Sequence, residues 1–203
     1  MEPFVMLDAI AVPIDEVNVD TNQLCPTRFN KVPRGAGYER ILFHDRRFDA
    51  QGNEIADFIL NRAPYRKAHI IVAERNFGCG SSRESAVYAL HAFGFRSVIA
   101  PSFGDIFTSN CLKNGLLPVR LPAEVVAEMR RQLHAQVGAT VKVDLAQQIV
   151  SGPDGRAHSF EIDPLQKRCL LEGLDDIALT QRYGNELAAF EVGHRAAMPW
   201  LFR

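Results

Sequence analysis

The sequence predicts an α/β fold in which a mixed β-sheet is flanked by helices. Two short apolar runs rich in β-branched residues, Ile70–Ala73 and Ser97–Ala100, are typical of strands that are covered on both faces. Apolar residues between them recur at helical spacing, so residues 70–100 are predicted to form a right-handed strand–helix–strand unit with parallel strands. Further along, the turn signal Gly-Pro-Asp-Gly at 152–155 separates two β-type segments and predicts an antiparallel hairpin.

The other elements follow along the chain from the same signals. The Asx- and Thr-rich stretch 18–26 and the basic, Gly-containing segment 27–47 are predicted loops. Without a clear linker or an internal repeat, the sequence reads as one domain. The remaining strands are expected at residues 7–13, 116–121, 140–150 and 157–162, and the helices at 55–60, 82–93, 101–113, 122–136, 164–171 and from 175 onward.

The composition is that of a globular protein without a charge bias. Of the 203 residues, 47% are apolar and 23% are charged, a balance that can build a core. With 23 basic and 24 acidic residues the net charge is -1, so nucleic acid is not an expected partner. No apolar run approaches the roughly 20 residues that span a membrane, and the N-terminus does not resemble a signal peptide. We therefore expect a cytoplasmic protein with no membrane partner.

The cysteines do not suggest a metal centre built by this chain alone. A zinc or iron–sulfur site normally shows a close pair or a tight run of ligands. The four cysteines are far apart in the sequence, so we predict no metal site and interpret them as reduced thiols. They are Cys25, Cys79, Cys111 and Cys169.

The Gly-rich stretch after the first buried strand carries the strongest functional signal. Gly78 and Gly80 allow a tight turn and a close approach of a ligand to the backbone. Ser81, Ser82 and Arg83 come next, at the expected start of a helix, where free N–H groups favour an anion. Two hydroxyls and a guanidinium at this place indicate a carboxylate or a phosphate as the ligand.

One interpretation of this stretch is a dinucleotide fingerprint, which would make the protein a nucleotide-binding oxidoreductase. Gly78 and Gly80 supply the first two glycines, but Arg83 stands where a third glycine allows close helix–strand packing. The following strand ends in Ala-Pro-Ser and not in an acid that could hold a ribose. Both departures weaken this interpretation. Another interpretation makes Cys79 a nucleophile, which would need His69 or His91 as its base; the alternative is a thiol packed in a tight turn.

In the remaining interpretation, Ser81, Ser82 and Arg83 are the working groups. A guanidinium matches a carboxylate in bidentate fashion, and a serine can act as a base where N–H groups and the arginine charge stabilise its alkoxide. The structural alternative is that one serine caps the helix while Arg83 pairs with Glu84 or Asp105. A non-catalytic module that binds a dicarboxylate is an alternative from another class.

Several blocks of the sequence together resemble a known family. The segment NFGCGSSRE at 76–84 resembles the signature of the swivelling domain of the aconitase superfamily, most closely that of 3-isopropylmalate dehydratase small subunits. Other blocks agree in order and spacing, so the resemblance covers about residues 5–190. They are NVDT at 18–21, APSFGDIF at 100–107, NGLLP at 114–118 and GLDDIALT at 173–180.

The resemblance implies a fold, an activity and partners. The fold would be a swivelling β/β/α domain of the aconitase type over residues 1–203, with a core at about 5–190 and a C-terminal tail at 191–203. The activity would be that of a hydro-lyase in leucine biosynthesis, which isomerises 2-isopropylmalate and 3-isopropylmalate by dehydration and rehydration. The substrate would be a small dicarboxylic hydroxy acid. A large subunit would carry a [4Fe–4S] cluster, and this chain would bind no cofactor.

The resemblance also implies roles for particular residues. By position, Ser81 is the base that takes the proton from the carbon next to the carboxylate. Ser82 and Arg83 bind and orient the substrate carboxylate. Arg34, in a Gly-flanked loop, lies where the family reads the variable side chain of the substrate and its other carboxylate.

This sequence departs from the family pattern at a few positions. Asn22 stands where family members more often have an acid, and Ser85 stands where they more often have a histidine. Leu24 and Cys25 replace the usual pair of aliphatic residues before a proline. The serine–serine–arginine core is intact, so the reaction class is expected to hold. The alternative is a paralogous small subunit that acts on a related acid, of the methylmalate/citraconate or homoaconitate type.

Overall fold

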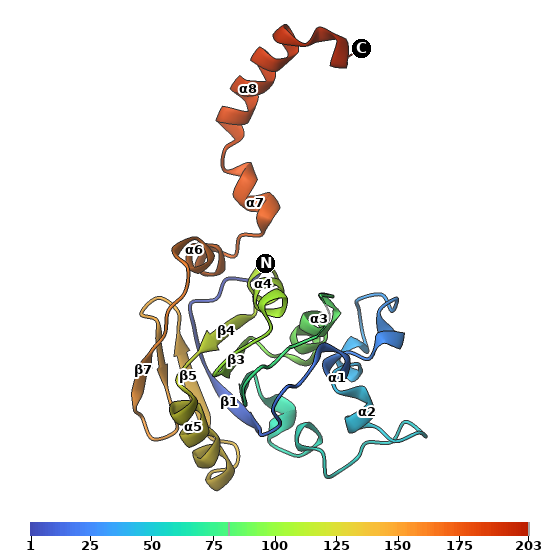
Figure 1. The fold of residues 1–203 in the computed structure, drawn as a ribbon, viewed down its shortest axis with the longest axis vertical. Helices are drawn as coiled ribbons and strands as arrows, with labels where there is room; N and C mark the ends of the chain where they lie inside the picture. Colours follow the sequence, from blue (N-terminus) through green and yellow to red (C-terminus); the bar gives the residue numbers. More distant parts are fainter. Residues whose placement is uncertain (81, 203) are drawn as a thin grey trace.

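A computed structural model describes residues 1–80 and 82–202. Within these residues the strands form one seven-stranded sheet in the order β4-β3-β2-β1-β5-β6-β7 (Figure 1). The predicted fold class, a mixed sheet flanked by helices, is confirmed. The strands are β1 (Met6–Ile14), β2 (Ile70–Ala73), β3 (Ser97–Ala100), β4 (Leu117–Arg120), β5 (Thr140–Asp144), β6 (Ile149–Ser151) and β7 (Ala157–Ser159).

The sheet has a parallel half and an antiparallel half. Strands β1 to β4 run parallel, with Ala11 opposite Ile70 and Val98 opposite Pro118. On the other side of β1, strands β5, β6 and β7 follow in antiparallel order. Because parallel strands point the same way, the loops that follow β1, β2 and β3 lie at the same edge of the sheet.

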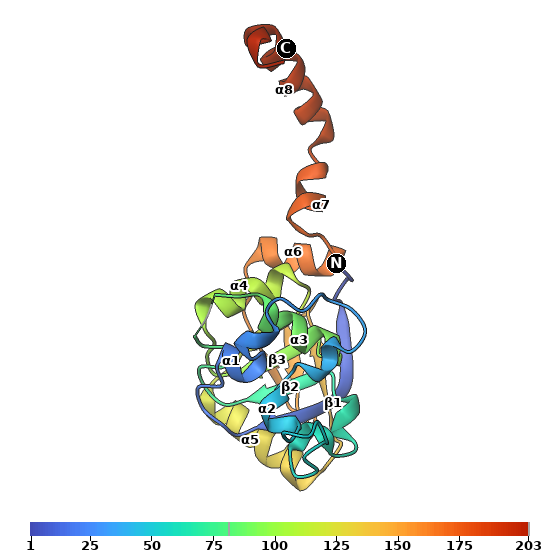
Figure 2. The ribbon, with the colours of Figure 1, turned by 90° about the vertical axis from the view of Figure 1, so that its right-hand side faces the viewer.

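Helices and loops cover both faces of the sheet (Figure 2). Strand β2 shows why its sequence is apolar throughout: Ile71 faces the core that contains α3 and α4, whereas Ile70 and Val72 face the core that contains α5 and α6. The helices are α1 (Thr21–Leu24), α2 (His44–Arg47), α3 (Ser85–Phe93), α4 (Asp105–Lys113), α5 (Ala123–Ala135), α6 (Pro164–Glu172), α7 (Asp176–Gln181) and α8 (Gly184–Ala197).

The antiparallel half contains a turn that the sequence did not predict. Strand β5 ends at Asp144, whose carboxylate accepts a hydrogen bond of 2.8 Å from the backbone of Gln147, and Gln148 has a φ of 56°. This tight turn divides the strand expected at 140–150 into β5 and β6, and neither glycine nor proline marks it in the sequence. The hairpin at 152–155 joins β6 to β7 as predicted, although β7 stops before residue 162.

The helix predicted at 55–60 is wrong. Only a 3₁₀ turn forms there, at Ile59–Asn61. The backbone of Ile55 is already engaged with another segment, since its N–H donates to the carbonyl of Arg47 at 2.8 Å and its carbonyl accepts from the side chain of Asn61 at 2.9 Å. A helix that begins at Ile55 would need this carbonyl for its own hydrogen bonds.

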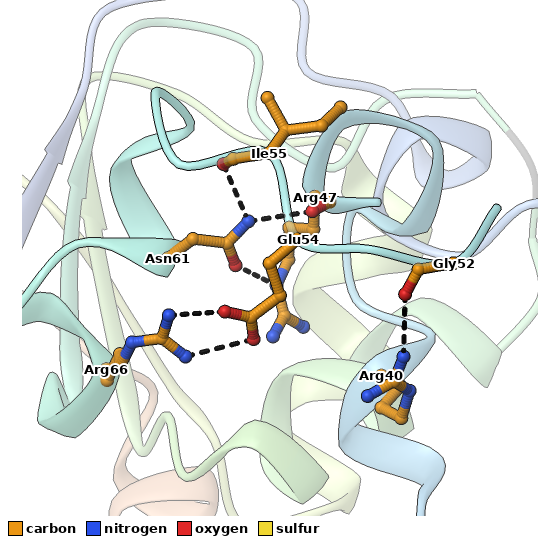
Figure 3. Close-up of polar contacts among 7 residues, drawn as sticks. All are labelled: Arg40, Arg47, Gly52, Glu54, Ile55, Asn61 and Arg66. Atoms are coloured by element: carbon orange, nitrogen blue, oxygen red, sulfur yellow. Dashed lines mark hydrogen bonds and ion pairs between the residues drawn. The ribbon is translucent and has the colours of Figure 1, made fainter. Parts of the chain in front are cut away.

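A buried cation anchors the segment between α2 and β2 (Figure 3). Arg47 is only 5% exposed, and its Nε donates to Asn61 Oδ1 at 3.1 Å. The Nδ2 of Asn61 donates in return to the carbonyl of Arg47 at 2.7 Å, as well as to Ile55. Burial lowers the pKa of Arg47 to about 10, against the opposing effect of Glu54, which itself pairs with Arg66. Asn61 thus connects a desolvated guanidinium to two stretches of backbone.

We expect the substitution Asn61→Leu to lower the free energy of unfolding by about 2–4 kcal/mol, because it takes an acceptor from a buried cation and a donor from two carbonyls. Urea denaturation followed by circular dichroism measures the change. The control is Gln51→Leu in the exposed turn nearby, which should stay within about 0.5 kcal/mol of the parent. Equal effects of the two substitutions would contradict this account of Arg47.

The C-terminal helices project from the body of the domain. Helices α7 and α8 extend away from the sheet, and a 3₁₀ turn at Pro199–Phe202 follows them (Figures 1 and 2). Apolar side chains on this projection are exposed, among them Phe190 and Trp200. None of the helices in the described residues is long and apolar enough to cross a membrane. The expected division into a core at about 5–190 and a tail stays a prediction, and α8 runs across that boundary.

Candidate active site

Loops from neighbouring parallel strands interlock at the edge where β1 and β2 end. The Gly78 N–H donates to the carbonyl of Val19 at 2.7 Å, and the Thr21 N–H donates to the carbonyl of Cys79 at 2.9 Å. These reciprocal backbone bonds fix the loop after β1 against the loop after β2. The polar residues on either side of this junction therefore have defined positions relative to one another.

The loop after β3 joins the same assembly. The Gly104 N–H donates to the carbonyl of Phe77 at 3.0 Å, and the hydroxyl of Ser102 accepts a hydrogen bond of 2.9 Å from the Asn76 N–H. Three of the sequence blocks that carry the family resemblance thus form one continuous structure, although they lie far apart in the chain.

Close packing explains one of the two glycines in the signature. Gly78 has a φ of 73°, and a Cβ at this position would lie 2.2 Å from the ring of Phe107. Gly78 therefore makes room for a buried aromatic ring, which corrects the expectation that it makes room for a ligand. Gly80 has a φ of 99°, but a Cβ there would meet no described atom nearer than 3.5 Å. Its glycine is required by the turn and not by packing.

Arg83 is held by neutral oxygen atoms. Its Nη2 donates to Asn22 Oδ1 at 3.0 Å and to Thr27 Oγ1 at 3.2 Å, and the Thr27 hydroxyl donates to the same Asn22 oxygen at 2.9 Å. Among the described residues it forms no ion pair, so the predicted alternative of a pair with Glu84 or Asp105 is not found there. No described residue accepts a hydrogen bond from its Nε or Nη1. That edge of the guanidinium has the geometry for a bidentate contact with a carboxylate.

Arg83 and Arg34 line the same pocket. Arg34 is exposed, and its Cζ lies 3.9 Å from the ring centroid of Tyr88, a cation–π contact that holds the guanidinium at the pocket. The structure therefore brings together the two arginines that were predicted to bind carboxylates. The pocket has a volume of about 260 Å³ and is lined by Asn30, Val32, Arg34, Tyr38, Arg83, Glu84, Ser85 and Tyr88.

The two serines of the signature are less well defined. Ser81, the predicted base, lies outside the described residues, and its role stays a prediction. Ser82 is exposed and is not among the residues that line the pocket. Its carbonyl accepts a hydrogen bond of 3.2 Å from Asn110 Nδ2 and not from the helix. Helix α3 begins only at Ser85, so the expectation that Ser82 starts the helix is wrong.

The described residues do not support Cys79 as a nucleophile. Burial and the nearby charge of Asp20 raise the pKa of Cys79, and its Sγ lies 3.5 Å from the carbonyl of Asn18. The proposed base His69 is engaged elsewhere, with Nδ1 at 2.6 Å from the carbonyl of Gly94. A nucleophilic thiol needs a lowered pKa and a base beside it. We therefore interpret Cys79 as a packed thiol.

The residues that the structure describes do not fit a metal cluster. They contain no group of three or more His, Cys, Asp or Glu side chains that could hold a metal ion. The cysteines are free, with Cys25, Cys111 and Cys169 buried in the protein. An iron–sulfur cluster needs several thiolates around one point.

A larger hollow of about 880 Å³ lies between the β4 side of the sheet and the segment that follows β7. Its charged groups are Arg120, Glu161 and Asp163, and its remaining lining is largely apolar. None of the residues predicted to bind substrate lines it. We therefore place the candidate site at the smaller pocket, where the two arginines meet.

The fold and the interlocked loops define a domain of the aconitase C-terminal class. The family model described as the aconitase C-terminal domain matches residues 1–124. The model LeuD_N matches residues 127–164, and the model described as the C-terminal domain of the 3-isopropylmalate dehydratase small subunit matches residues 176–203. The chain belongs to the family of 3-isopropylmalate dehydratase small subunits, and the resemblance seen in the sequence is confirmed.

Relatives named 3-isopropylmalate dehydratase small subunit match this chain over nearly its full length. The chain is 48% identical over 201 residues to the 3-isopropylmalate dehydratase small subunit of Paramagnetospirillum magneticum, covering 99% of this chain and 100% of the relative. With the same coverage, it is 50% identical to that of Dinoroseobacter shibae. A crystal structure of 3-isopropylmalate dehydratase from Methanocaldococcus jannaschii matches with a TM-score of 0.64 over 91% of this chain and 98% of that one. At 22% identity, that match supports the fold alone.

Sequence reasoning missed the residues that hold the arginines in place. Asn22 was noted as a departure from the family pattern, but nothing in the sequence placed it against Arg83. Thr27 gave no signal at all. Tyr88 could have been found, because Glu84 and Tyr88 stand four residues apart in a helical stretch, the spacing at which side chains meet.

We expect the substitution Gly78→Ala to destabilise the domain by about 3–5 kcal/mol, because it adds a clash with the Phe107 ring to the strain of a positive φ. Gly80→Ala carries the backbone strain without the clash and should cost about 1–2 kcal/mol. Thermal unfolding of both variants measures the difference. Phe107→Leu in the Gly78→Ala background should recover part of the loss, and an equal cost for both alanines would contradict the packing role of Gly78.

Proposed function

We propose that this chain is the small subunit of a heteromeric hydro-lyase that isomerises 2-isopropylmalate and 3-isopropylmalate by dehydration and rehydration in leucine biosynthesis. The observation that carries the proposal is the pocket in which Arg34 and Arg83 meet, in a chain whose full-length relatives bear the name of this small subunit. A substrate with two carboxylates suits a pocket with two guanidiniums. We keep the cytoplasm as the expected location.

In this proposal the residues of the chain bind, orient and deprotonate the substrate. Arg83 offers the Nε and Nη1 side of its guanidinium to one carboxylate, while Asn22 and Thr27 hold Nη2. Arg34 contacts the other carboxylate or the variable side chain from across the pocket. Ser82 adds a contact to the carboxylate that Arg83 binds. Ser81 takes the proton from the carbon next to the carboxylate, a step that requires an alkoxide, which a positive charge would stabilise.

The site would be completed by a large subunit. The name of the relatives implies such a partner, and the described part of this chain lacks a metal-binding group that could polarise the substrate hydroxyl. A [4Fe–4S] cluster held by the large subunit would act as the Lewis acid on that hydroxyl. Binding of the acid to the small subunit alone should then be weak, because half of the site is missing.

The substrate preference can be tested in the assembled complex. We expect kcat/KM for 2-isopropylmalate to exceed that for a 2-methylmalate-type acid by at least about tenfold, because each additional methylene buried against an apolar side chain, such as Val32 in the pocket lining, contributes about 1–3 kcal/mol. The absorbance of the unsaturated intermediate follows both reactions. A preference for a methylmalate-type or a homoaconitate-type acid would replace this proposal by the paralogous alternative.

Arg83 is the binding residue that the geometry supports best. We expect Arg83→Ala to lower kcat/KM of the complex by at least about 30-fold, because a charge-assisted hydrogen-bonded contact is worth about 2 kcal/mol or more. Arg83→Lys should recover little, since an ammonium cannot make the bidentate contact. Arg131→Ala, which removes an exposed arginine from α5, is the matched control. Normal kinetics for Arg83→Ala would remove this residue from the site.

A further inference from the structure

The pocket contains charges of both signs that do not pair with each other. Arg34, Arg83 and Glu84 all line it. Among the described residues, Glu84 nevertheless forms no ion pair with either arginine. Opposite charges in a pocket of about 260 Å³ attract one another, so some other contact has to keep the carboxylate away from the guanidiniums.

Tyr88 makes contacts that separate these charges. Its phenolic oxygen donates a hydrogen bond to Glu84 Oε2. Its ring lies beneath the guanidinium of Arg34, at 3.9 Å from Cζ to the ring centroid. Tyr88 stands one helical turn after Glu84 on α3, and the Tyr88 N–H donates to the carbonyl of Glu84 at 3.0 Å, so the positions of the two side chains are set by the helix.

Packing against the core keeps the Tyr88 side chain in contact with both Glu84 and Arg34. It is partly buried and packs against the core on the α3 face of the sheet. The bond to Glu84, together with burial, raises the pKa of Tyr88, so the phenol keeps its proton and remains a donor. Arg34, by contrast, lies in an exposed, Gly-flanked loop. No described residue forms a hydrogen bond with its side chain, so the contact with the Tyr88 ring is what holds it.

We propose that Tyr88 is a positioning residue that keeps the opposite charges of the pocket apart: its hydroxyl binds the Glu84 carboxylate while its ring binds the Arg34 guanidinium. Neither guanidinium is then neutralised by Glu84, so both can contact the carboxylates of the substrate. The inference rests on the proposed role of Arg34 and Arg83 in substrate binding. Without the phenolic hydroxyl, the Glu84 carboxylate competes with the substrate for the same cations.

The test uses the assembled complex and separates binding from turnover. We expect Tyr88→Phe to raise KM for 2-isopropylmalate about three- to tenfold, because a freed carboxylate forms a competing charge-assisted contact. The value of kcat should change less than about twofold, since the competition ends once substrate is bound. Adding Glu84→Gln in the Tyr88→Phe background should return KM toward that of the parent. Tyr65→Phe, which removes a phenol outside the pocket, is the matched control.

Two outcomes would overturn the inference. One is a normal KM for Tyr88→Phe, and the other is a raised KM that Glu84→Gln does not rescue, as expected if the tyrosine only supports the fold. The variant Arg34→Ala separates failure of this inference from failure of the proposed function. A normal KM for Arg34→Ala would remove Arg34 from the proposed substrate site, independently of the results for the Tyr88 variants.

The ring contact is tested separately on the small subunit by hydrogen exchange. Tyr88→Leu removes the platform under Arg34 and should increase exchange of the backbone amides at residues 31–37, whereas Tyr88→Phe keeps the ring and should not. Equal exchange in the two variants would show that the ring does not hold this loop.

Discussion

The candidate site depends on one set of backbone contacts, the reciprocal hydrogen bonds between the loops that follow β1 and β2. The Gly78 N–H bonded to Val19 and the Thr21 N–H bonded to Cys79 bring two distant blocks of sequence into register. They form because both strands are parallel and end at the same edge of the sheet. The close approach also requires a residue without a side chain at 78, where the ring of Phe107 occupies the space of a Cβ.

This junction has a direct consequence for the charges of the site. Asn22 and Thr27 follow the loop after β1, and Arg83 follows the loop after β2, so joining the loops places two neutral acceptors against the guanidinium. An acid at position 22 would hold Arg83 as well, but it would also neutralise it. The amide of Asn22 orients the guanidinium and leaves its positive charge available to an anion.

The departures from the family pattern gather around the same pocket. Asn22 bonds Arg83, and Ser85 lines the pocket and donates to Asn30 Oδ1 at 3.0 Å. Burial raises the pKa of Cys25, against the opposing effects of the Ser85 side chain and the charge of Arg83. At Asn22 and Ser85 the departures therefore fall at the pocket that the proposed site would use to select its substrate.

The sequence was sufficient for the architecture where the signals are local. The apolar run of β2 and the hairpin at 152–155 each predicted what the structure contains. The sequence did not predict the helix boundaries correctly where contacts between distant residues override the local preference of the chain. Asn61 binds the Ile55 carbonyl, which a helix at 55–60 would need, and Asn110 binds the carbonyl of Ser82, after which α3 begins at Ser85.

The same limit applies to the candidate site. The residue types at 81–83 indicated a site for a carboxylate or a phosphate, and the resemblance supplied the roles. Neither could show that Asn22 and Thr27 hold Arg83, or that Tyr88 contacts Arg34 and Glu84 together. The contacts of Arg83 with Asn22 and Thr27, and of Arg34 with Tyr88, join segments separated by tens of residues, and only the packing of the loops onto α3 determines them.

The central claim is that this chain contributes the base and the carboxylate-binding groups to an active site shared with a large subunit. The most direct measurement is the turnover of 2-isopropylmalate by the assembled complex with Ser81→Ala, alongside the affinity of that variant for the large subunit. The account predicts unchanged assembly and a fall in kcat of at least about 100-fold, the usual contribution of a positioned base. Near-normal turnover in an intact complex would contradict it.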